Sequence, residues 1–492
     1  MIRSAGILMP VSALPSEYGI GTLGEEAEKF IDFLAESGQT YWQILPTGPT
    51  GFGNSPYQSL SSFAGSHYLI DLKKLIDQGL LEKKEADAPD WGKDPEEIDY
   101  GKLYNHRLKV LRKACARLAL KHPDDYLRFI TEEKSWLYDY AVFMAIKEEQ
   151  KGAAWHQWPA ELRNHKSEAV HREAERLKDE VIFWERVQYL FYTQMKEIKA
   201  YAEKKGIQII ADLPFYVAAD SIDVWSHPEQ FELDGEYRMT YCAGMPGGQK
   251  WGNPLFRFDQ MRNDNYSWWI ERCMHQFRFA DVLRIDHFRG FESYYAVDMH
   301  NDAHSHWRKG PGLEIFRRLE EKAGKRQMIL EDLGELTPEF IAMVKESGYP
   351  GMRILQYAFD PNDPGSVYMP FQYIRNSVVY TGTHDNDTLA GWINDPQNKK
   401  RIERAREYLG AGKTGDMRTA LLKCAYASVS DLAIVQMQDV LGLDSSHRTN
   451  DPAADGNHWS FRIKKGSYDR KTAEQLKEWM LLYCRNNWNA KV

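Results

Sequence analysis

The sequence predicts an α/β fold, a (β/α)8 TIM barrel with inserted, largely helical subdomains. Three observations support this. Eight short β-type apolar runs are spread along the 492 residues, helical segments separate several of them, and polar residues follow many of the runs. A doubly wound parallel sheet is the alternative, because it is built from the same alternation. In a barrel, the carboxyl ends of the strands would carry the chemistry.

The expected strands are rich in Ile, Leu, Val and Met. They are Gly6–Met9, Tyr41–Leu45, Ile207–Asp212, Asp281–Asp286, Gln327–Asp332, Met352–Leu355, Val378–Thr381 and Leu432–Met437. A helix is expected over Gly24–Ser37, where the apolar residues share one face and Gly38 provides a stop. Another is expected to begin at Thr337-Pro338 and to end at Gly348.

We expect one catalytic barrel domain over residues 1–492 with two insertions. Over 72–206, charges are frequent and apolar residues recur at helical spacing, which predicts a helical insertion subdomain. Residues 213–280 are expected to form a loop and helix insertion that lines the active-site cleft. The segment Ser37–Ile70 contains no Asp, Glu, Lys or Arg and is dense in Gly, Pro and Ser, which is typical of loops.

Composition argues against several classes of partner and site. The net charge of −8 and the lack of a basic cluster argue against a nucleic-acid partner. Five cysteines at wide spacing, with no CxxC, argue against a disulfide framework or a zinc site and fit a reducing cytosol. Pro10 and Pro15 interrupt the apolar N-terminal stretch, and no apolar run is long enough to span a membrane. We therefore expect a cytoplasmic monomer or weak homo-oligomer with no membrane partner.

Two motif fragments suggest a cofactor or a metal at first sight. Gly19-Ile-Gly21-Thr-Leu-Gly24 matches GxGxxG, but it lies too far from the preceding strand, and the next strand supplies no carboxylate for a ribose. A glycine-rich turn is the better interpretation. His300, His304 and His306 fit a polar surface loop better than a metal site.

Carboxylates follow four of the expected strands: Asp212, Asp286, Glu331 (with Asp332) and Asp385. Side chains alternate along a strand, so Arg284 and Asp286 share one face and Ile285 points away. An arginine beside Asp286 keeps that carboxylate ionised, as a nucleophile requires.

Glu331 ends an apolar strand, where burial would make it a general acid. Asp385 follows His384, and the two could hydrogen-bond substrate hydroxyls. Such carboxylates suit retaining glycoside chemistry, which requires the Asp286 and Glu331 carboxyls to lie roughly 5–5.5 Å apart. Ordinary strand-end capping would explain any one of them alone.

Four aromatic residues lie near Gly, Pro, Asn or Asp, where a ring can pack on a sugar: Tyr57, Trp225, Trp251 and Trp392. Core packing is the alternative for each.

Long, ordered motifs carry a resemblance to a known family over nearly the whole chain. They include Ser55-Pro-Tyr57-Gln58, Asp212-Leu-Pro, Gln249-Lys-Trp251-Gly-Asn253-Pro, Arg284-Ile-Asp286-His-Phe-Arg-Gly290, Glu331-Asp-Leu-Gly334, Thr381-Gly-Thr-His384-Asp385-Asn386, Gln438-Asp-Val-Leu-Gly442 and Asn450-Asp-Pro452. On these, the chain resembles the 4-α-glucanotransferases of glycoside hydrolase family 77, the amylomaltases or disproportionating enzymes.

The resemblance implies a barrel that acts on α-1,4-glucans and maltooligosaccharides with no metal and no organic cofactor. It implies three catalytic roles, with Asp286 as nucleophile, Glu331 as acid/base and Asp385 as transition-state stabiliser. The residues it implies around the substrate form two groups. Tyr57, Asp212, Arg284 and His384 would line the subsite before the cleaved bond, and Ser55, Gln249, Trp251 and Asn450 would hold the glucan around it.

One departure concerns the loop over 244–251. The family usually carries a longer loop with an aromatic flap there, whereas here Pro246 is joined to Gln249 by only Gly247-Gly248. The main hypothesis is a glucan transferase, and the short loop makes an α-1,4-glucan hydrolase with the same carboxylates the alternative. A catalytically inert glucan-binding protein is a third hypothesis, which the intact carboxylates disfavour.

Overall fold

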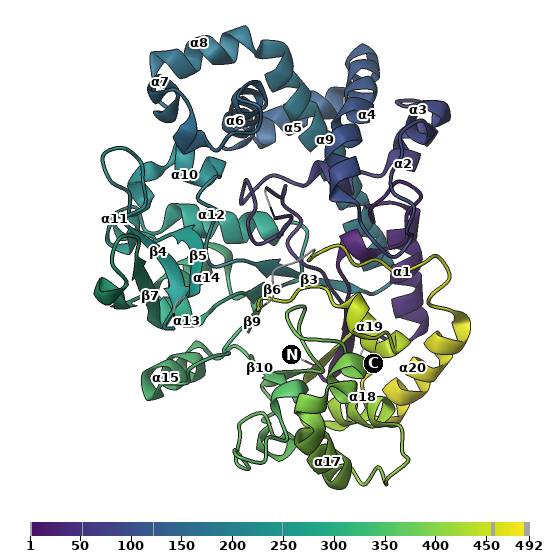
Figure 1. The fold of residues 1–492 in the computed structure, drawn as a ribbon. Coiled ribbons are helices and arrows are strands. Elements are labelled where there is room, and N and C mark those ends of the chain that lie inside the picture. The colour runs from purple at the N-terminus through teal and green to yellow at the C-terminus, as the bar shows by residue number, and fades with distance from the viewer. Residues whose placement is uncertain (1, 52, 122, 248, 454–457, 487–492) are drawn as a thin grey trace.

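Eight parallel strands close into a barrel in the computed structural model, which describes residues 2–51, 53–121, 123–247, 249–453 and 458–486 (Figure 1). The order around the barrel is β1-β12-β11-β10-β9-β6-β3-β2. The closed barrel confirms the predicted fold class and excludes the doubly wound sheet. The strands are β1 (Ser4–Leu8), β2 (Tyr41–Gln43), β3 (Gln208–Leu213), β6 (Val282–Ile285), β9 (Gln327–Leu330), β10 (Gly351–Ile354), β11 (Ser377–Tyr380) and β12 (Leu432–Gln436).

Side chains fill the barrel interior, as the alternation along each strand requires. Val282 of β6 points into the barrel and Leu283 points out to the surrounding shell, so Arg284 follows Val282 inward. Inside, the Tyr380 hydroxyl donates to Gln43 Oε1 at 2.8 Å. The interior cluster consists of Leu8, Tyr41, Leu45, Ile210, Val282, Ile329, Met352, Ile354, Val378, Tyr380, Leu432, Ile434 and Trp459.

Both helices argued from the sequence are present. Helix α1 (Glu25–Glu36) buries its apolar face, and α15 (Pro338–Ser347) is capped by Thr337 and ends at the left-handed Gly348. The other helices after β3 are α10 (Ile222–Ser226), α11 (Phe258–Asn263), α12 (Ser267–Gln276), α13 (Arg289–Glu292), α14 (Glu314–Ala323), α16 (Leu389–Asn394), α17 (Lys399–Tyr408), α18 (Met417–Ala427), α19 (Met437–Leu441) and α20 (Arg470–Leu482).

Helices lie one after another over residues 72–206 and stand above the barrel in Figure 1. The last of them, α9, supports the loop that precedes α2. Its Gln188 exchanges two hydrogen bonds with the backbone of Gly65, and Gln194 accepts from the Asp71 N–H. These helices are α2 (Leu72–Asp77), α3 (Lys83–Asp87), α4 (Tyr100–Lys121), α5 (Asp124–Glu132), α6 (Leu137–Glu149), α7 (Ala160–Arg163), α8 (Glu168–Arg176) and α9 (Lys178–Lys204).

A second sheet, in the order β5-β4-β7-β8, lies beside the barrel. Its strands are β4 (Tyr241–Met245), β5 (Gln249–Pro254), β7 (Ser293–Asp298) and β8 (His306–Lys309). β4 and β5 form a hairpin in which Met245 pairs with Gln249, so the predicted short connection is a tight turn. Gly248, at that turn, lies outside the described residues.

Within the described ranges, no helix is long and apolar enough to cross a membrane. All five cysteines are free thiols, and three of them are buried.

Candidate active site

The Arg284 guanidinium is the centre of the charged groups at the carboxyl end of the barrel. Its side chain is only 3% exposed. Nη1 donates to both carboxylate oxygens of Asp212, each at 2.7 Å, and to Asp286 Oδ1 at 3.1 Å. Nη2 lies 3.5 Å from Glu331 Oε2. Arg284 and Asp286 therefore share the inner face, as predicted, and one cation joins three strand-end carboxylates.

Burial opposes the charge on Arg284, but the surrounding carboxylates outweigh it and raise its pKa. Arg284 is therefore a permanent cation. The surroundings of Glu331, in contrast, favour its protonated form. Burial, followed by the nearby Asp286 carboxylate, raises the pKa of Glu331 well above its usual value. A carboxyl whose pKa is raised by burial can act as a general acid.

The residue between Asp286 and the next helix has an unusual backbone. His287 has φ of +43°, in the left-handed region that few residues other than glycine adopt. This turn directs the His287 N–H to Glu331 Oε2 at 2.5 Å, and the next N–H, of Phe288, to the Glu331 carbonyl at 3.2 Å. The bond to the carboxyl favours its ionised form and partly offsets burial. The strained backbone at His287 therefore lowers the pKa of Glu331 below the value that burial alone would give it.

We expect substitutions of His287 to separate backbone from side-chain effects. His287→Asn tolerates the left-handed conformation, whereas the β-branched His287→Val does not, and both lack the imidazole. In His287→Val the pKa of Glu331 should rise, which moves the alkaline limb of the pH profile of kcat/KM to higher pH. His287→Asn should keep the parent profile. The same shift in both variants would instead assign the effect to the imidazole.

The imidazole of His287 does not complicate that measurement. Its ring packs edge-to-face on Trp251, with 5.0 Å between centroids, and also contacts Phe215 and Tyr216. Burial among these rings lowers the pKa of His287 to about 4, so the ring is neutral across the neutral pH range.

Asp385 lies in the loop after β11 and is held from two sides. Asn450 Nδ2 donates to Asp385 Oδ1 at 2.6 Å, and His384 Nε2 lies 3.3 Å from the same oxygen. The Asn450 N–H also donates to the His384 carbonyl at 3.1 Å. The Asp385 side chain is 42% exposed. This carboxylate is accessible, but its position is fixed by hydrogen bonds.

Tyr57 connects the Asp385 loop to the Arg284 group. Its hydroxyl donates to Asp212 Oδ2 at 2.9 Å, and its ring stacks on His384 at 5.0 Å and 15° between planes. The Trp459 ring lies 5.7 Å from each of these two rings. The Ser55 hydroxyl accepts the Tyr57 N–H at 3.3 Å, which places Ser55 next to this aromatic group.

Gln249 and Trp251 reach the site from the second sheet. The Trp251 indole donates to Gln249 Oε1 at 3.4 Å, and its carbonyl accepts from Gln58 Nε2 at 3.4 Å. Because Trp251 packs on His287, this strand lies beside the residue that follows Asp286. The contacts described here link all eleven site residues expected from the sequence into one connected group.

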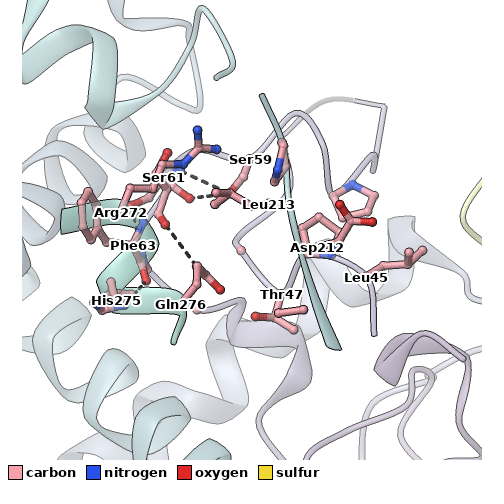
Figure 2. Close-up of a pocket in the computed structure, with 18 of the residues that line it drawn as sticks. Leu45, Thr47, Ser59, Ser61, Phe63, Asp212, Leu213, Arg272, His275 and Gln276 are labelled. Atoms are coloured by element: carbon pink, nitrogen blue, oxygen red, sulfur yellow. Dashed lines mark hydrogen bonds between the residues drawn. The ribbon is translucent and has the colours of Figure 1, made fainter. Parts of the chain in front are cut away.

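A pocket extends from Asp212 toward α12 (Figure 2). Asp212 and Leu213 lie on one side, and Arg272, His275 and Gln276 lie on the other. Thr47 also lines the pocket, and Ser61 and Phe63 lie beside α12, where the His275 ring nitrogen is 3.2 Å from the Phe63 carbonyl. Tyr57 and Asp212 of the site line this pocket, whereas Asp286 and Glu331 do not.

Two of the aromatic candidates were wrong. Trp225 is completely buried, packs against Trp158 and donates its indole N–H to the Leu162 carbonyl. Trp392 is buried as well, in α16. Phe143 and Trp158, from distant segments, pack against the Trp225 ring, and the nearby Gly or Asp residues in the sequence do not indicate such packing.

Tyr357 is an aromatic candidate that the sequence analysis missed. It follows β10, is 39% exposed, hydrogen-bonds Asn386 and lies within the electrostatic reach of Glu331 and Asp385. Its position just beyond a barrel strand was the signal available in the sequence. Over the described ranges, no group of three or more His, Cys, Asp or Glu side chains could hold a metal ion, the three histidines at 300–306 included.

Comparisons with known proteins agree with this geometry. The family model described as 4-alpha-glucanotransferase (glycoside hydrolase family 77) matches residues 9–468. The 4-alpha-glucanotransferase of Clostridium butyricum is 40% identical over 97% of this chain and 100% of its own length, and that of Streptococcus pneumoniae is 41% identical over 99% and 98%. The chain belongs to the 4-alpha-glucanotransferase family.

Solved structures related to this family show how far the similarity extends. Amylomaltase from Streptococcus agalactiae, solved in complex with acarbose, has a TM-score of 0.95 and 36% identity, and the match covers 99% of this chain and 100% of that one. Amylomaltase from Corynebacterium glutamicum shares the fold at 17% identity, with a TM-score of 0.77 over 99% of this chain and 75% of that one.

Proposed function

We propose that the protein is a 4-α-glucanotransferase that moves a segment of an α-1,4-glucan to the 4-OH of glucose or a maltooligosaccharide. The observation that carries this proposal is the Arg284 group, in which one buried cation joins Asp286 and a Glu331 carboxyl of raised pKa. Membership of the family and the acarbose complex of the Streptococcus agalactiae relative support an α-glucan substrate.

In the first step, the Glu331 carboxyl gives its proton to the glycosidic oxygen. The bond from the anomeric carbon to that oxygen breaks, and an Asp286 carboxylate oxygen bonds to the carbon from the opposite face. The leaving sugar departs with a free 4-OH. Arg284 donates a hydrogen bond to Asp286 and so orients this nucleophile. Asp385 faces the positive charge that develops on the sugar ring.

In the second step, the acceptor's 4-OH gives its proton to the Glu331 carboxylate. Its oxygen then bonds to the anomeric carbon as the bond to Asp286 breaks. Two displacements restore the α configuration, so the product is again an α-1,4-glucan. Of the binding candidates, Tyr57, Asp212, Arg284 and His384 would hold the sugar before the cleaved bond. Ser55, Gln249, Trp251 and Asn450 would hold the glucan around it.

The tight β4–β5 turn favours a second candidate function, α-1,4-glucan hydrolysis by the same carboxylates. Met245 pairs directly with Gln249, so this hairpin contributes little cover beside Trp251. Water competes with the acceptor for the Asp286 intermediate, and cover over the site is what limits its access.

Incubation with maltotriose tests the transferase against the hydrolase. Transfer yields glucose together with a ladder of longer maltodextrins, and the ladder is the expected result. Glucose and maltose without longer products, and with no suppression by added acceptor, would identify a hydrolase. No turnover of maltotriose or of longer glucans would reject both candidates in favour of the inert binding protein.

The division into a barrel domain with insertions at 72–206 and 213–280 stays a prediction. So do the cytoplasmic location and the monomeric or weakly associating state. Light scattering over a range of concentrations would test the last of these.

A further inference from the structure

Two adjacent polar side chains follow β12, and the reaction scheme above uses neither. Gln438 and Asp439 lie in α19, and both are completely buried. They begin the Gln438–Gly442 motif, which carries part of the family resemblance without a role. A buried amide and a buried carboxylate are costly unless they make hydrogen bonds, so their partners indicate what they do.

Asp439 joins the two ends of the loop that carries Asp385. Its Oδ2 accepts the Thr381 hydroxyl at 2.6 Å, and its Oδ1 accepts the Leu389 N–H at 2.7 Å. Thr381 directly follows β11, and Leu389 begins α16. One carboxyl therefore fixes both the exit and the return of the 381–389 loop.

Gln438 holds the other segment that contacts Asp385. Its Nε2 donates to the Thr449 hydroxyl at 2.9 Å and to the His447 carbonyl at 3.3 Å. The next residue, Asn450, donates to Asp385 Oδ1. Gln438 thus acts on Asp385 through a different segment from the loop that Asp439 holds.

The base of this arrangement is rigid. β12 pairs with β1 on one side and with β11 on the other. From α18, Arg418 Nη1 donates to the carbonyls of Asp439 and Val440 at 2.9 and 2.8 Å. Asp385 itself is 42% exposed and lies on a loop, so its position depends on contacts made to the ends of that loop.

We propose that Gln438 and Asp439 are positioning residues for Asp385, one holding each of the two loops that fix its carboxylate. The inference rests on the proposed function, because it assumes that Asp385 stabilises the transition state. A charge that acts on a transition state must be held in place before the reaction, and a misplacement of about 1 Å can cost about 100-fold in rate.

A double-mutant cycle between Asp439 and Asp385 tests the proposal, because positioning predicts that the effects of the two substitutions on kcat are not additive. In Asp439→Asn, the NH2 group replaces one carboxylate oxygen, so either the Thr381 hydroxyl must turn to accept or the Leu389 N–H loses its acceptor, and both remaining bonds lose the carboxylate charge. We expect kcat for maltotriose to fall on the order of 10-fold. In an Asp385→Asn background, the same substitution should change kcat less than about 2-fold, because the group it positions has gone. Equal losses in both backgrounds would overturn the proposal.

Asp281→Asn is the matched control. Asp281 lies at the amino end of β6, where its carboxylate bonds Lys199 Nζ and the Ile209 N–H, so it also joins two elements. Its substitution should have the same small effect on kcat with or without Asp385. If Asp385→Asn alone keeps full activity, the proposed role of Asp385 fails, and the positioning proposal fails with it. Loss from Asp439→Asn without any loss from Asp385→Asn would assign Asp439 to another group.

Two milder substitutions cover the case in which Asp439→Asn does not fold. Thr381→Val removes one hydroxyl bond to Asp439 and keeps the side-chain volume. Gln438→Met removes the bonds to the 447–450 segment. Each should lower kcat about 3- to 10-fold and lose that effect in the Asp385→Asn background. A folded Thr381→Val or Gln438→Met variant with the parent kcat would overturn the proposal for that loop.

Discussion

Asp286→Asn is expected to lower kcat for maltotriose disproportionation on the order of 10⁴-fold or more, with little change in stability. The amide keeps the shape of the side chain but cannot form the bond to the anomeric carbon. Residual cleavage would depend on Glu331 and on substrate binding alone. Initial rates of glucose release, with circular dichroism to confirm folding, measure the effect.

A smaller side chain and an added anion make this test specific. In Asp286→Gly, azide can occupy the vacated space and attack from the same face, so a β-glucosyl azide is expected. Asp281→Asn, at the opposite end of β6, should keep the parent kcat. An α-configured azide, or an Asp286→Asn variant with more than a tenth of the parent rate, would contradict a nucleophilic role for Asp286.

Arg284→Leu is expected to cost about 3–5 kcal/mol of unfolding free energy near pH 8, besides abolishing activity. Arg284 is buried and contacts Asp212, Asp286 and Glu331, so its removal leaves these carboxylates without their cation. Chemical unfolding at several pH values measures the loss.

The pH dependence of that loss has a definite sign. Burial already raises the pKa of Asp212 and Glu331, and Arg284 opposes this in both. Without Arg284, both pKa values rise further above their unfolded values. The variant should therefore lose stability as pH rises from about 5 to 8, and its deficit relative to the parent should be smallest at pH 5.

Two further variants identify the cause. Arg284→Lys keeps a charge and should retain part of the stability, and Asp212→Asn combined with Arg284→Leu should recover part of the loss. A deficit that is the same at pH 5 and pH 8 would attribute the effect to lost packing instead.

The positions of polar side chains at the strand ends could be predicted from the sequence where the alternation along one strand determines them. The alternation along β6 fixes Arg284 and Asp286 on the inner face, and the apolar run of β9 brings Glu331 to the same end of the barrel. These features depend on neighbours two residues apart along one strand. The eight strands themselves were found within a residue or two for the same reason.

The features that were missed depend on long-range contacts. β4 and β5 contain glycine and proline, and β4 becomes a strand through its pairing with β7, about fifty residues later. The left-handed turn at His287 is accompanied by a hydrogen bond to Glu331, which follows another strand, β9. The roles proposed for Gln438 and Asp439 depend on contacts with the 381–389 loop and the 447–450 segment. The neighbouring residues in the sequence do not indicate such contacts.

Closure of the barrel has a consequence for synthesis of the chain. β1 is made first, but one of its two neighbours is β12, and Ser4 pairs with Leu432. At typical rates of translation, roughly 20 to 90 seconds separate these two residues on the ribosome. Throughout that interval, the nascent sheet has an unpaired edge at β1, which is the kind of edge that other chains can join. Asn450, which donates to Asp385, is synthesised after β12. The surroundings of Asp385 are therefore completed by a segment made near the end of synthesis. A ribosome-bound chain becomes active only after that segment has emerged.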